Sequence, residues 1–230
     1  WSEDCKQTFL EAFPGNKIIS KKIGILHFAL PIPKFKKMKN KNLRILFVAR
    51  WFDAKGGRQT LEVFNRLSKK YPKIKFIFIC PTPKEFKKKY AKNKQIEIID
   101  LLPQENLFKE IFPSSDIFFY PGFGDSYGFC VPEAMMFGLP VITSNTFAKK
   151  ELVSKGKTGF LIDKPKNWKG YEDMNEKMLK QFEEKTSLLI ENKKLREKMS
   201  CEARKFAQDK FSIEKRNKKL REFYEEDLKN

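Results

Sequence analysis

The sequence predicts an α/β fold: a Rossmann-like, doubly wound parallel sheet of about six strands, followed by C-terminal helices. Three observations lead to this prediction. Short apolar runs recur without polar alternation, as in strands that are buried on both faces. Amphipathic or basic segments of helical length separate these runs. From Asn167 onward, apolar side chains recur at helical spacing. The expected strand order is 3-2-1-4-5-6.

The strands are expected at the apolar runs, with Pro and other turn residues near their ends. The first strand is followed by an expected helix with Leu61, Phe64 and Leu67 on one face. Residues 84–93 and 103–112 are also expected to be helical. The expected strands cover residues 43–49, 74–80, 95–100, 117–120, 139–143 and 157–162, the last at a sheet edge.

Both ends of the chain are expected to be helical. Residues 1–13 form a short amphipathic helix that ends before Pro14. Residues 167–230 are expected to be helical throughout, with Ser212 capping the last helix. Three apolar stripes on this segment are expected to pack into the core rather than to bind a cofactor. They comprise Met174, Met178 and Phe182; Leu195, Met199 and Phe206; and Ile213, Leu220 and Tyr224.

Composition narrows the functional classes. The 230 residues are 40% hydrophobic, which is enough for a globular core, yet no apolar run approaches a membrane span and no signal peptide is visible. Four cysteines without a CxxC pair and one histidine argue against a zinc site, a disulfide framework or a histidine-based triad. We therefore expect a cytoplasmic protein. The chain opens on Trp1 rather than Met, so we expect a piece of a longer protein.

The net charge of +19 has two readings of equal weight. One is a Lys-rich composition with solvated helix faces, and the other is peripheral contact with an anionic membrane. Nucleic-acid binding ranks below both, because the excess is Lys and base readout relies on Arg. We expect no nucleic-acid partner.

A glycine-rich stretch from Tyr120 to Pro140 follows the fourth expected strand and leads into a helix with Pro132 in its first turn. A strand, a glycine-rich loop and a helix N-terminus together favour an anion site. Asp125 and Glu133 frame this loop with seven residues between them. Carboxylates suit sugar hydroxyls rather than phosphate, so the combination suggests a nucleotide sugar.

Two cations follow the first expected strand, Arg50 and Lys55, just before a Gly-Gly pair. The carboxyl end of a first strand lies at the switch point of an open sheet, where ligands bind. The alternative is a pair of surface cations near a glycine turn.

Asp125 to Gly138, DSYGFCVPEAMMFG, resembles the EGFGxxxxEAMxxG signature of retaining GT-B glycosyltransferases of the family-four type, the glycosyl transferases group 1. Arg50 and Lys55 resemble the GR-x4-KG motif of the same family, with Ala49 in place of its first Gly. The first acid of the signature is Asp here, not Glu. Near Glu151 the sequence also departs from a GG-x-x-E segment, so that Glu151 is either a supporting acid or a solvated helix residue.

The resemblance implies the donor-binding half of a GT-B fold and a retaining hexosyltransferase that needs neither metal nor cofactor. Residues 1–40 would end the N-terminal domain and link the two domains, residues 41–210 would bind the donor, and residues 211–230 would return toward the first domain. Arg50 and Lys55 would hold the diphosphate, Asp125 the sugar hydroxyls and Glu133 the ribose diol. The catalytic residues implied are Arg50, Lys55 and Asp125, and the donor-binding residues are Arg50, Lys55, Asp125, Gly128, Phe129, Cys130 and Glu133.

The acceptor, whether a glycan, a lipid or a small molecule, is not specified by the sequence. Without an acceptor domain the chain is expected to bind donor but to transfer poorly. Two alternatives remain open. One is a non-catalytic nucleotide-sugar-binding module, and the other is a basic protein that docks on a membrane surface and keeps the fold.

Overall fold

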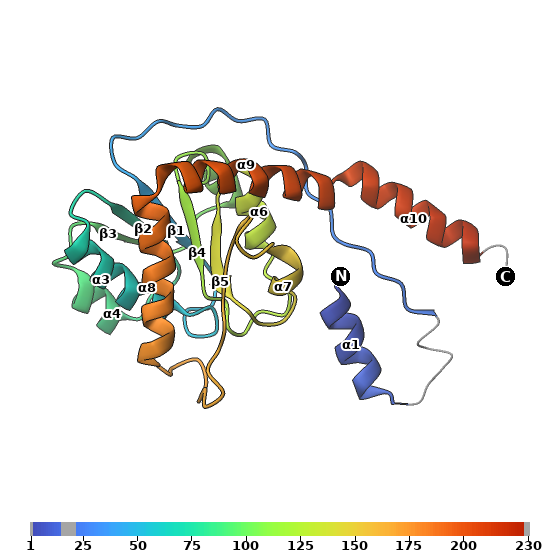
Figure 1. Cartoon of the computed structure of the whole chain (residues 1–230), viewed down its shortest axis with the longest axis horizontal. Coiled ribbons are helices and arrows are strands. Elements are labelled where there is room, and N and C mark those ends of the chain that lie inside the picture. The colour runs from blue at the N-terminus through green and yellow to red at the C-terminus, as the bar shows by residue number, and fades with distance from the viewer. Residues whose placement is uncertain (1, 15–21, 228–230) are drawn as a thin grey trace.

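The computed structural model describes residues 2–14 and 22–227. Its centre is a six-stranded, wholly parallel sheet in the order β3-β2-β1-β4-β5-β6, which confirms the predicted fold class and strand order (Figure 1). The edge position predicted for the last strand is also confirmed. The strands are β1 (Arg44–Val48), β2 (Lys75–Ile79), β3 (Ile96–Ile99), β4 (Ile117–Tyr120), β5 (Val141–Ser144) and β6 (Gly159–Ile162).

Helices cover both faces of the sheet, which explains why its strands read as apolar runs. On one face, the ring of Phe119 in β4 lies 5.3 Å from the rings of both Phe64 and Phe182. The neighbouring Phe118 points to the other face, where its ring meets Phe112 at 6.2 Å. The helices are α1 (Glu3–Ala12), α3 (Gly57–Lys70), α4 (Lys84–Tyr90), α5 (Gln104–Asn106), η1 (Leu107–Ile111), α6 (Cys130–Met136), α7 (Lys149–Leu152), α8 (Glu176–Glu191), α9 (Lys193–Lys210) and α10 (Ile213–Asp227).

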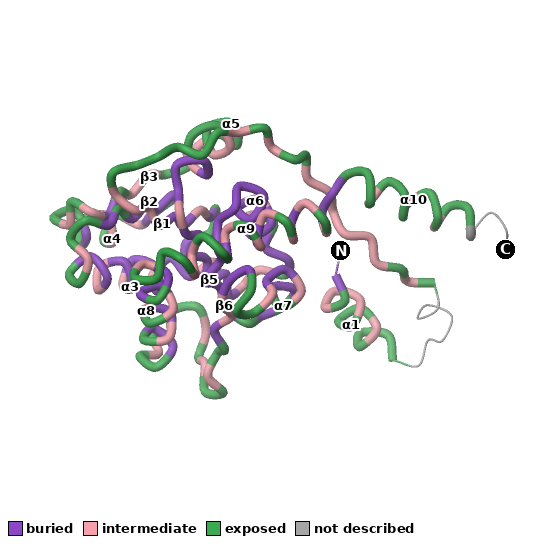
Figure 2. The backbone as a smooth tube through the Cα atoms, turned by 45° about the horizontal axis from the view of Figure 1, so that its top comes forward, coloured by how far each residue is buried: buried purple, intermediate pink, exposed green. Residues whose placement is uncertain are grey.

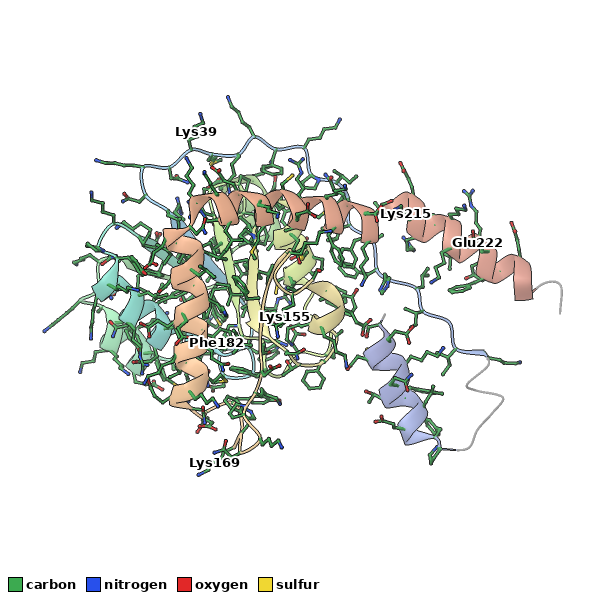
Figure 3. The ribbon with its side chains drawn as sticks, in the orientation of Figure 1. Lys39, Lys155, Lys169, Phe182, Lys215 and Glu222 are labelled. Carbon is green, nitrogen blue, oxygen red and sulfur yellow. The ribbon has the colours of Figure 1, made fainter. Side chains whose placement is uncertain are left out.

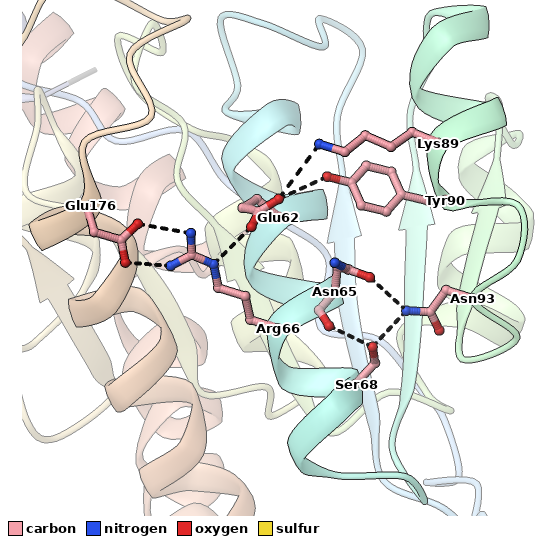
Figure 4. Close-up of polar contacts among 8 residues, drawn as sticks. All are labelled: Glu62, Asn65, Arg66, Ser68, Lys89, Tyr90, Asn93 and Glu176. Atoms are coloured by element: carbon pink, nitrogen blue, oxygen red, sulfur yellow. Dashed lines mark hydrogen bonds and ion pairs between the residues drawn. The ribbon is translucent and has the colours of Figure 1, made fainter.

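The helix α3 is joined to its neighbours by polar contacts as well as by its apolar face (Figure 4). Arg66 makes two hydrogen bonds to Glu176 of α8, at 2.7 and 2.9 Å, and one to Glu62 of its own helix. The hydroxyl of Tyr90 in α4 donates to Glu62 at 3.2 Å. These contacts fix α4 and α8 against α3, whose first residues follow the loop after β1.

The prediction of continuous helix over residues 167–230 is wrong at its beginning. Residues 163–175 form an irregular loop, and α8 begins only after Asn175, whose side chain caps it by accepting from Met178 N at 3.2 Å. The reason is tertiary: Gln59 of α3 donates to the carbonyl oxygens of Tyr171 and Asp173, at 2.7 and 2.9 Å, and holds them in a non-helical conformation.

The predicted apolar stripes are buried only where their helix packs against the rest of the molecule. Met178, Phe182 and Met199 are buried, while Met174 is exposed. The third stripe does not enter the core, because α10 extends past the sheet and its covering helices. Ile213 and Tyr224 are exposed (Figure 2). Leu195 and Phe206 pack against the core, and Leu220 is half-buried.

The predicted cap of α10 is confirmed, since Ser212 Oγ accepts from Lys215 N at 3.1 Å. Just before it, Leu30 N donates to Phe211 O at 2.9 Å, which ties the segment preceding β1 to the start of α10. Residues 31–42 are irregular and pass the end of the sheet where β4 begins, since Met38 N donates to Pro113 O at 3.0 Å. Lys39 projects outward from this segment (Figure 3). The predicted domain boundaries stay a prediction. In the described part of the chain, no helix combines the length and apolarity that crossing a bilayer requires.

The first helix, α1, confirms the helix predicted near the N-terminus, although Trp1 lies outside the described residues. Ser2 caps α1 by accepting from Cys5 N at 3.1 Å. No residue within α1 is buried, and Phe9 and Phe13 are exposed. We call residues 43–212, which hold the sheet and its covering helices, the body of the molecule; α1 and α10 lie outside it (Figure 1).

Candidate functional site

The candidate site lies where the strand order reverses, between the carboxyl ends of β1 and β4. Two loops meet there, the cation loop after β1 (residues 49–57) and the glycine loop after β4 (residues 121–128). Gly122 N donates to Lys55 O at 3.0 Å, and Gly124 N donates to Ala54 O at 2.7 Å. Gly56 has φ +80°, and a Cβ there would lie 2.6 Å from Cβ of Pro121. The glycines therefore let the two loops interlock.

Lys55 and Asp125 are brought together by these loops, although they are distant in the sequence. Lys55 Nζ lies 3.3 Å from Asp125 Oδ1 and donates to Gly124 O at 3.0 Å. Their side chains are only 15% and 14% exposed, so water screens the pair weakly. The hydroxyl of Tyr120 donates to Asp125 Oδ2, and burial raises the pKa of Tyr120 well above its usual value, which keeps this donor protonated.

Arg50 lies at the same edge of the sheet, immediately after Ala49, but it does not join the pair of Lys55 and Asp125. It is exposed and forms no ion pair with any residue that the structure describes. Of the two predicted cations, the structure thus places Lys55 against an acid and leaves Arg50 facing solvent.

Glu133 occupies the first turn of α6, and its neighbour is Gln104 of α5 rather than Lys55. Gln104 Nε2 donates to Glu133 Oε1 at 3.1 Å. Burial raises the pKa of Glu133 to about 7, and the hydrogen bond from Gln104 offsets part of this rise. Glu133 therefore changes charge near neutral pH. Gln104 was not predicted as a site residue, because nothing in its local sequence shows which acid it contacts.

The glycine loop ends at the start of α6. Gly128 has φ +86°, a conformation that favours glycine, and its carbonyl oxygen accepts from Val131 N at 2.9 Å. Phe129 precedes α6 and stays half exposed, with its ring 4.8 Å from Phe28. Cys130 opens the helix, and burial raises the pKa of its thiol well above the usual range, so that the thiol is neutral.

Lys149 is a second site residue that sequence reasoning missed. Its side chain is fully buried, and its Nζ donates to Gly122 O at 2.7 Å and to Asp125 O at 3.2 Å. Burial lowers the pKa of Lys149 to about 8. Its sequence neighbourhood, Ala148-Lys149-Lys150, reads as an ordinary exposed helical turn, so that no local signal marks it.

Glu151 is not a solvated helix residue, and its role as a supporting acid of the site stays a prediction. Its carboxylate accepts from the backbone N–H groups of Glu3 and Asp4, both at 2.9 Å, at the first turn of α1. Next to it, Lys150 Nζ lies 3.2 Å from Asp4 Oδ1. The carboxylate therefore compensates the unpaired donors and the positive end of α1. In addition, no group of three or more His, Cys, Asp or Glu side chains able to hold a metal ion occurs in the described ranges.

Comparison with known proteins identifies the family to which this chain is similar. Residues 31–206 match the family Glycosyl transferases group 1. An uncharacterized glycosyltransferase of Haemophilus influenzae is 32% identical over 213 residues, which cover 91% of this chain and 56% of that protein. The capsular polysaccharide biosynthesis glycosyltransferase CapM of Staphylococcus aureus is 26% identical over 190 residues, covering 78% of this chain and 45% of that protein.

The fold is also that of solved structures. HepE of Anabaena, solved in complex with UDP-glucose, matches with a TM-score of 0.77 at 14% identity, over 98% of this chain and 62% of that chain. This likeness concerns the Rossmann-like sheet of a GT-B fold. The chain spans about half the length of the curated relatives described above. The sequence match over residues 31–206 and the shared sheet show that the chain belongs to the glycosyl transferases group 1 family.

Proposed function

We propose that this chain forms the donor-binding half of a retaining glycosyltransferase, which binds a nucleotide-diphosphate sugar at the carboxyl edge of the sheet. The observation that carries the proposal is the meeting of Lys55 and Asp125, a cation and an acid from two different loops, at 3.3 Å. UDP-glucose in the related fold of HepE supports the choice of ligand class. Transfer to an acceptor then belongs to the whole protein.

In the proposed reaction, the bond between the anomeric carbon and the diphosphate breaks, and its electron pair goes to the diphosphate oxygen. The acceptor hydroxyl oxygen forms the new bond to the anomeric carbon, and its proton passes to the departing diphosphate oxygen. Lys55 and Arg50 stabilise the negative charge that develops on the leaving group. Arg50 is suited to this because it faces solvent and its planar guanidinium presents several N–H donors in a fixed fork.

The two acids divide the rest of the donor. Asp125 accepts from hydroxyl groups of the sugar, while Tyr120 fixes one of its oxygens. Glu133 accepts from the ribose diol, and Gln104 orients its carboxylate. At the start of α6, Gly128 lets the chain approach the diphosphate, and the backbone N–H groups of Phe129 and Cys130 face it. We further propose that no metal is needed, because Arg50 and Lys55 supply the positive charge.

The acceptor, whether glycan, lipid or small molecule, is proposed to be bound by a part of the protein outside this chain. The chain alone then binds donor with little turnover, because the two substrates are not held together. A cytoplasmic location is proposed with it. Peripheral contact with an anionic membrane is a further proposal, supported by the net charge of +19 and the outward-facing Lys39 (Figure 3).

Titration calorimetry tests the proposal, after a thermal-shift screen of UDP-glucose, GDP-mannose and ADP-glucose has identified the base. Lys55→Ala is expected to weaken both the nucleotide sugar and the free nucleotide about tenfold to a hundredfold, since each charge-assisted hydrogen bond contributes about 1.5–3 kcal/mol. Asp125→Ala is expected to spare the free nucleotide and to weaken the sugar-bearing form. Lys157→Ala, which removes a lysine paired with Glu202 at 3.4 Å, is the matched control. Unchanged affinity in Lys55→Ala would remove Lys55 from the site.

A second candidate is a nucleotide-sugar-binding module without catalysis. It is favoured by the shorter acid at Asp125 and by Phe147, a non-glycine residue with φ +51° beside the site. A transfer assay on the full-length protein separates the two, because a binding module would bind donor with full affinity and form no product.

A further inference from the structure

The geometry points to Lys149 as a positioning residue of the donor site, one that holds the glycine loop in the conformation that presents Asp125 to the sugar. This inference rests on the proposed function and adds a residue to it. It starts from the carbonyl oxygens of the glycine loop. Lys149 Nζ binds those of Gly122 and Asp125, at 2.7 and 3.2 Å, and Lys55 Nζ binds that of Gly124 at 3.0 Å. Two lysines, one from the cation loop and one from α7, thus hold three of four consecutive carbonyl groups.

The backbone N–H groups of the same segment are also engaged. Those of Gly122 and Gly124 donate to the cation loop, at 3.0 and 2.7 Å. The aliphatic part of the Lys149 side chain packs against Gly128, at the end of the glycine loop. A Cβ added at Gly128 would lie 3.7 Å from Lys149 Cγ. The segment from Gly122 to Asp125 is therefore fixed on one side by the cation loop and on the other by Lys149. Without Lys149, two of its carbonyl oxygens would lose their donor.

A buried ammonium at this position opposes folding. Lys149 is fully buried and forms no ion pair within the described residues, and desolvation is the main reason why its pKa is lowered to about 8. The nearby Asp125 raises this pKa in part, and Lys55 and Lys164 lower it. An apolar side chain of the same length would avoid the desolvation. The cation is thus better explained by what it does to the glycine loop than by what it adds to stability.

The position of Lys149 also separates it from the residues that touch the donor. Because its side chain is fully buried, it acts on the ligand only through the backbone of the glycine loop. Asp125 is the donor-facing residue whose own carbonyl oxygen Lys149 holds. Its loss should therefore affect the sugar more than the nucleotide.

The experiment measures binding of UDP and UDP-glucose, or of GDP and GDP-mannose if the screen selects guanine, to the 230-residue chain by calorimetry. Lys149→Met is expected to weaken the nucleotide sugar about tenfold and the free nucleotide less than threefold, with a melting temperature within about 3 °C of the wild type. Lys150→Met is the matched control. It removes the next lysine along α7, which is exposed and paired with Asp4, and it is expected to bind both ligands as the wild type does.

A pH series supplies a second readout, which a merely structural role would not change. The pKa of Lys149 is about 8, so this side chain loses its proton over a pH range of roughly 7.5 to 9.5. The affinity of the wild type for the nucleotide sugar is expected to fall over the same range. Lys149→Arg keeps its charge over this range and is expected to show a flatter profile. Asp125, Lys55, Cys130 and Lys164 face the same ammonium and are present in both proteins, so their contributions cancel in the comparison.

The inference is overturned if Lys149→Met binds the nucleotide sugar as tightly as the wild type. It is also overturned if the variant loses both ligands equally together with a large drop in melting temperature, because Lys149 would then serve stability alone. If Lys149→Arg does not fold, Lys149→Met at several pH values replaces it, and its affinity should be independent of pH across this range. Failure of the wild-type chain to bind any nucleotide sugar in the screen would instead refute the proposed function, and this inference with it.

Discussion

The body and the outlying helix α1 are held in place by different forces. In the body, Phe64, Phe119 and Phe182 are fully buried against one another. In α1 no residue is buried (Figure 2). The described contacts of α1 with Glu151 and Lys150 of the body are hydrogen bonds and an ion pair. The body therefore carries the stability of the molecule, while α1 is docked by a few directional contacts and can open locally at a small cost in free energy.

The same contrast holds for function. The residues proposed to bind the donor all lie in the body, at the end of a rigid sheet. The docking of α1 depends on Glu151, which is two residues from Lys149 in the short helix α7. One face of α7 thus contacts the glycine loop and another holds α1. Variants that affect one contact and spare the other show how far the two regions are independent.

The largest effect is expected from Phe64→Ala, which removes a fully buried ring from the face of the sheet that α3 and α8 cover. The free energy of unfolding, measured by chemical denaturation, should fall by about 3–5 kcal/mol. Phe9→Ala, which removes an exposed ring from α1, is expected to change it by no more than about 0.5 kcal/mol. Equal losses would show that α1 shares the core of the body.

A smaller effect is expected from the buried ammonium of Lys149. Its folded pKa of about 8 lies below the usual 10.5, so the unfolded chain binds more protons between these pH values. The penalty is fully present below pH 8 and is relieved as pH rises toward 10.5. Relative to Lys149→Met, the wild type should therefore gain up to about 3 kcal/mol over this window, as measured by denaturation at each pH. A constant difference would mean that Lys149 keeps an ordinary pKa.

The smallest effect on global stability is expected from Glu151→Ala. It removes a carboxylate that accepts two hydrogen bonds from backbone N–H groups of α1. Hydrogen exchange of the α1 amides should therefore become faster, by an amount equivalent to about 1.5–3 kcal/mol in opening free energy. Exchange in β1 and β4 should be unchanged. Lys150→Ala, which breaks an exposed ion pair, is the control, with an expected change below about 1 kcal/mol. Faster exchange throughout the sheet would show that α1 supports the body.

Much of the fold could be predicted because neighbouring residues in the sequence determine most of its strands and turns. The four residues of β4 and the order of all six strands follow from apolar runs, turn residues and the rules of doubly wound sheets. The error at residues 167–175 has a different origin. There the conformation is set by Gln59, which is more than a hundred residues away and binds two carbonyl groups of the loop. A side chain at that distance leaves no trace in the local pattern.

The site, like the fold, could be predicted where its residues belong to local motifs. The motifs located the two loops that meet, and the structure brings Lys55 and Asp125 together as the hypothesis requires. Their roles toward a donor remain predictions. Lys149 and the docking function of Glu151 could not be predicted, because each depends on backbone groups of a distant segment. Every residue has a backbone N–H or C=O group, so the sequence does not show which backbone group a side chain will contact.

The placement of the four free thiols has a practical consequence. Cys201 is exposed on α9 and Cys5 is half-buried on α1, whereas burial raises the pKa of Cys80 to about 12 and that of Cys130 well above its usual value. Thiol-directed dyes react through the thiolate, so at neutral pH they should attach to Cys201 and Cys5 and spare the other two. The natural sequence thus provides a fluorescent donor–acceptor pair that reports the separation of α1 from α9 without any engineered cysteine.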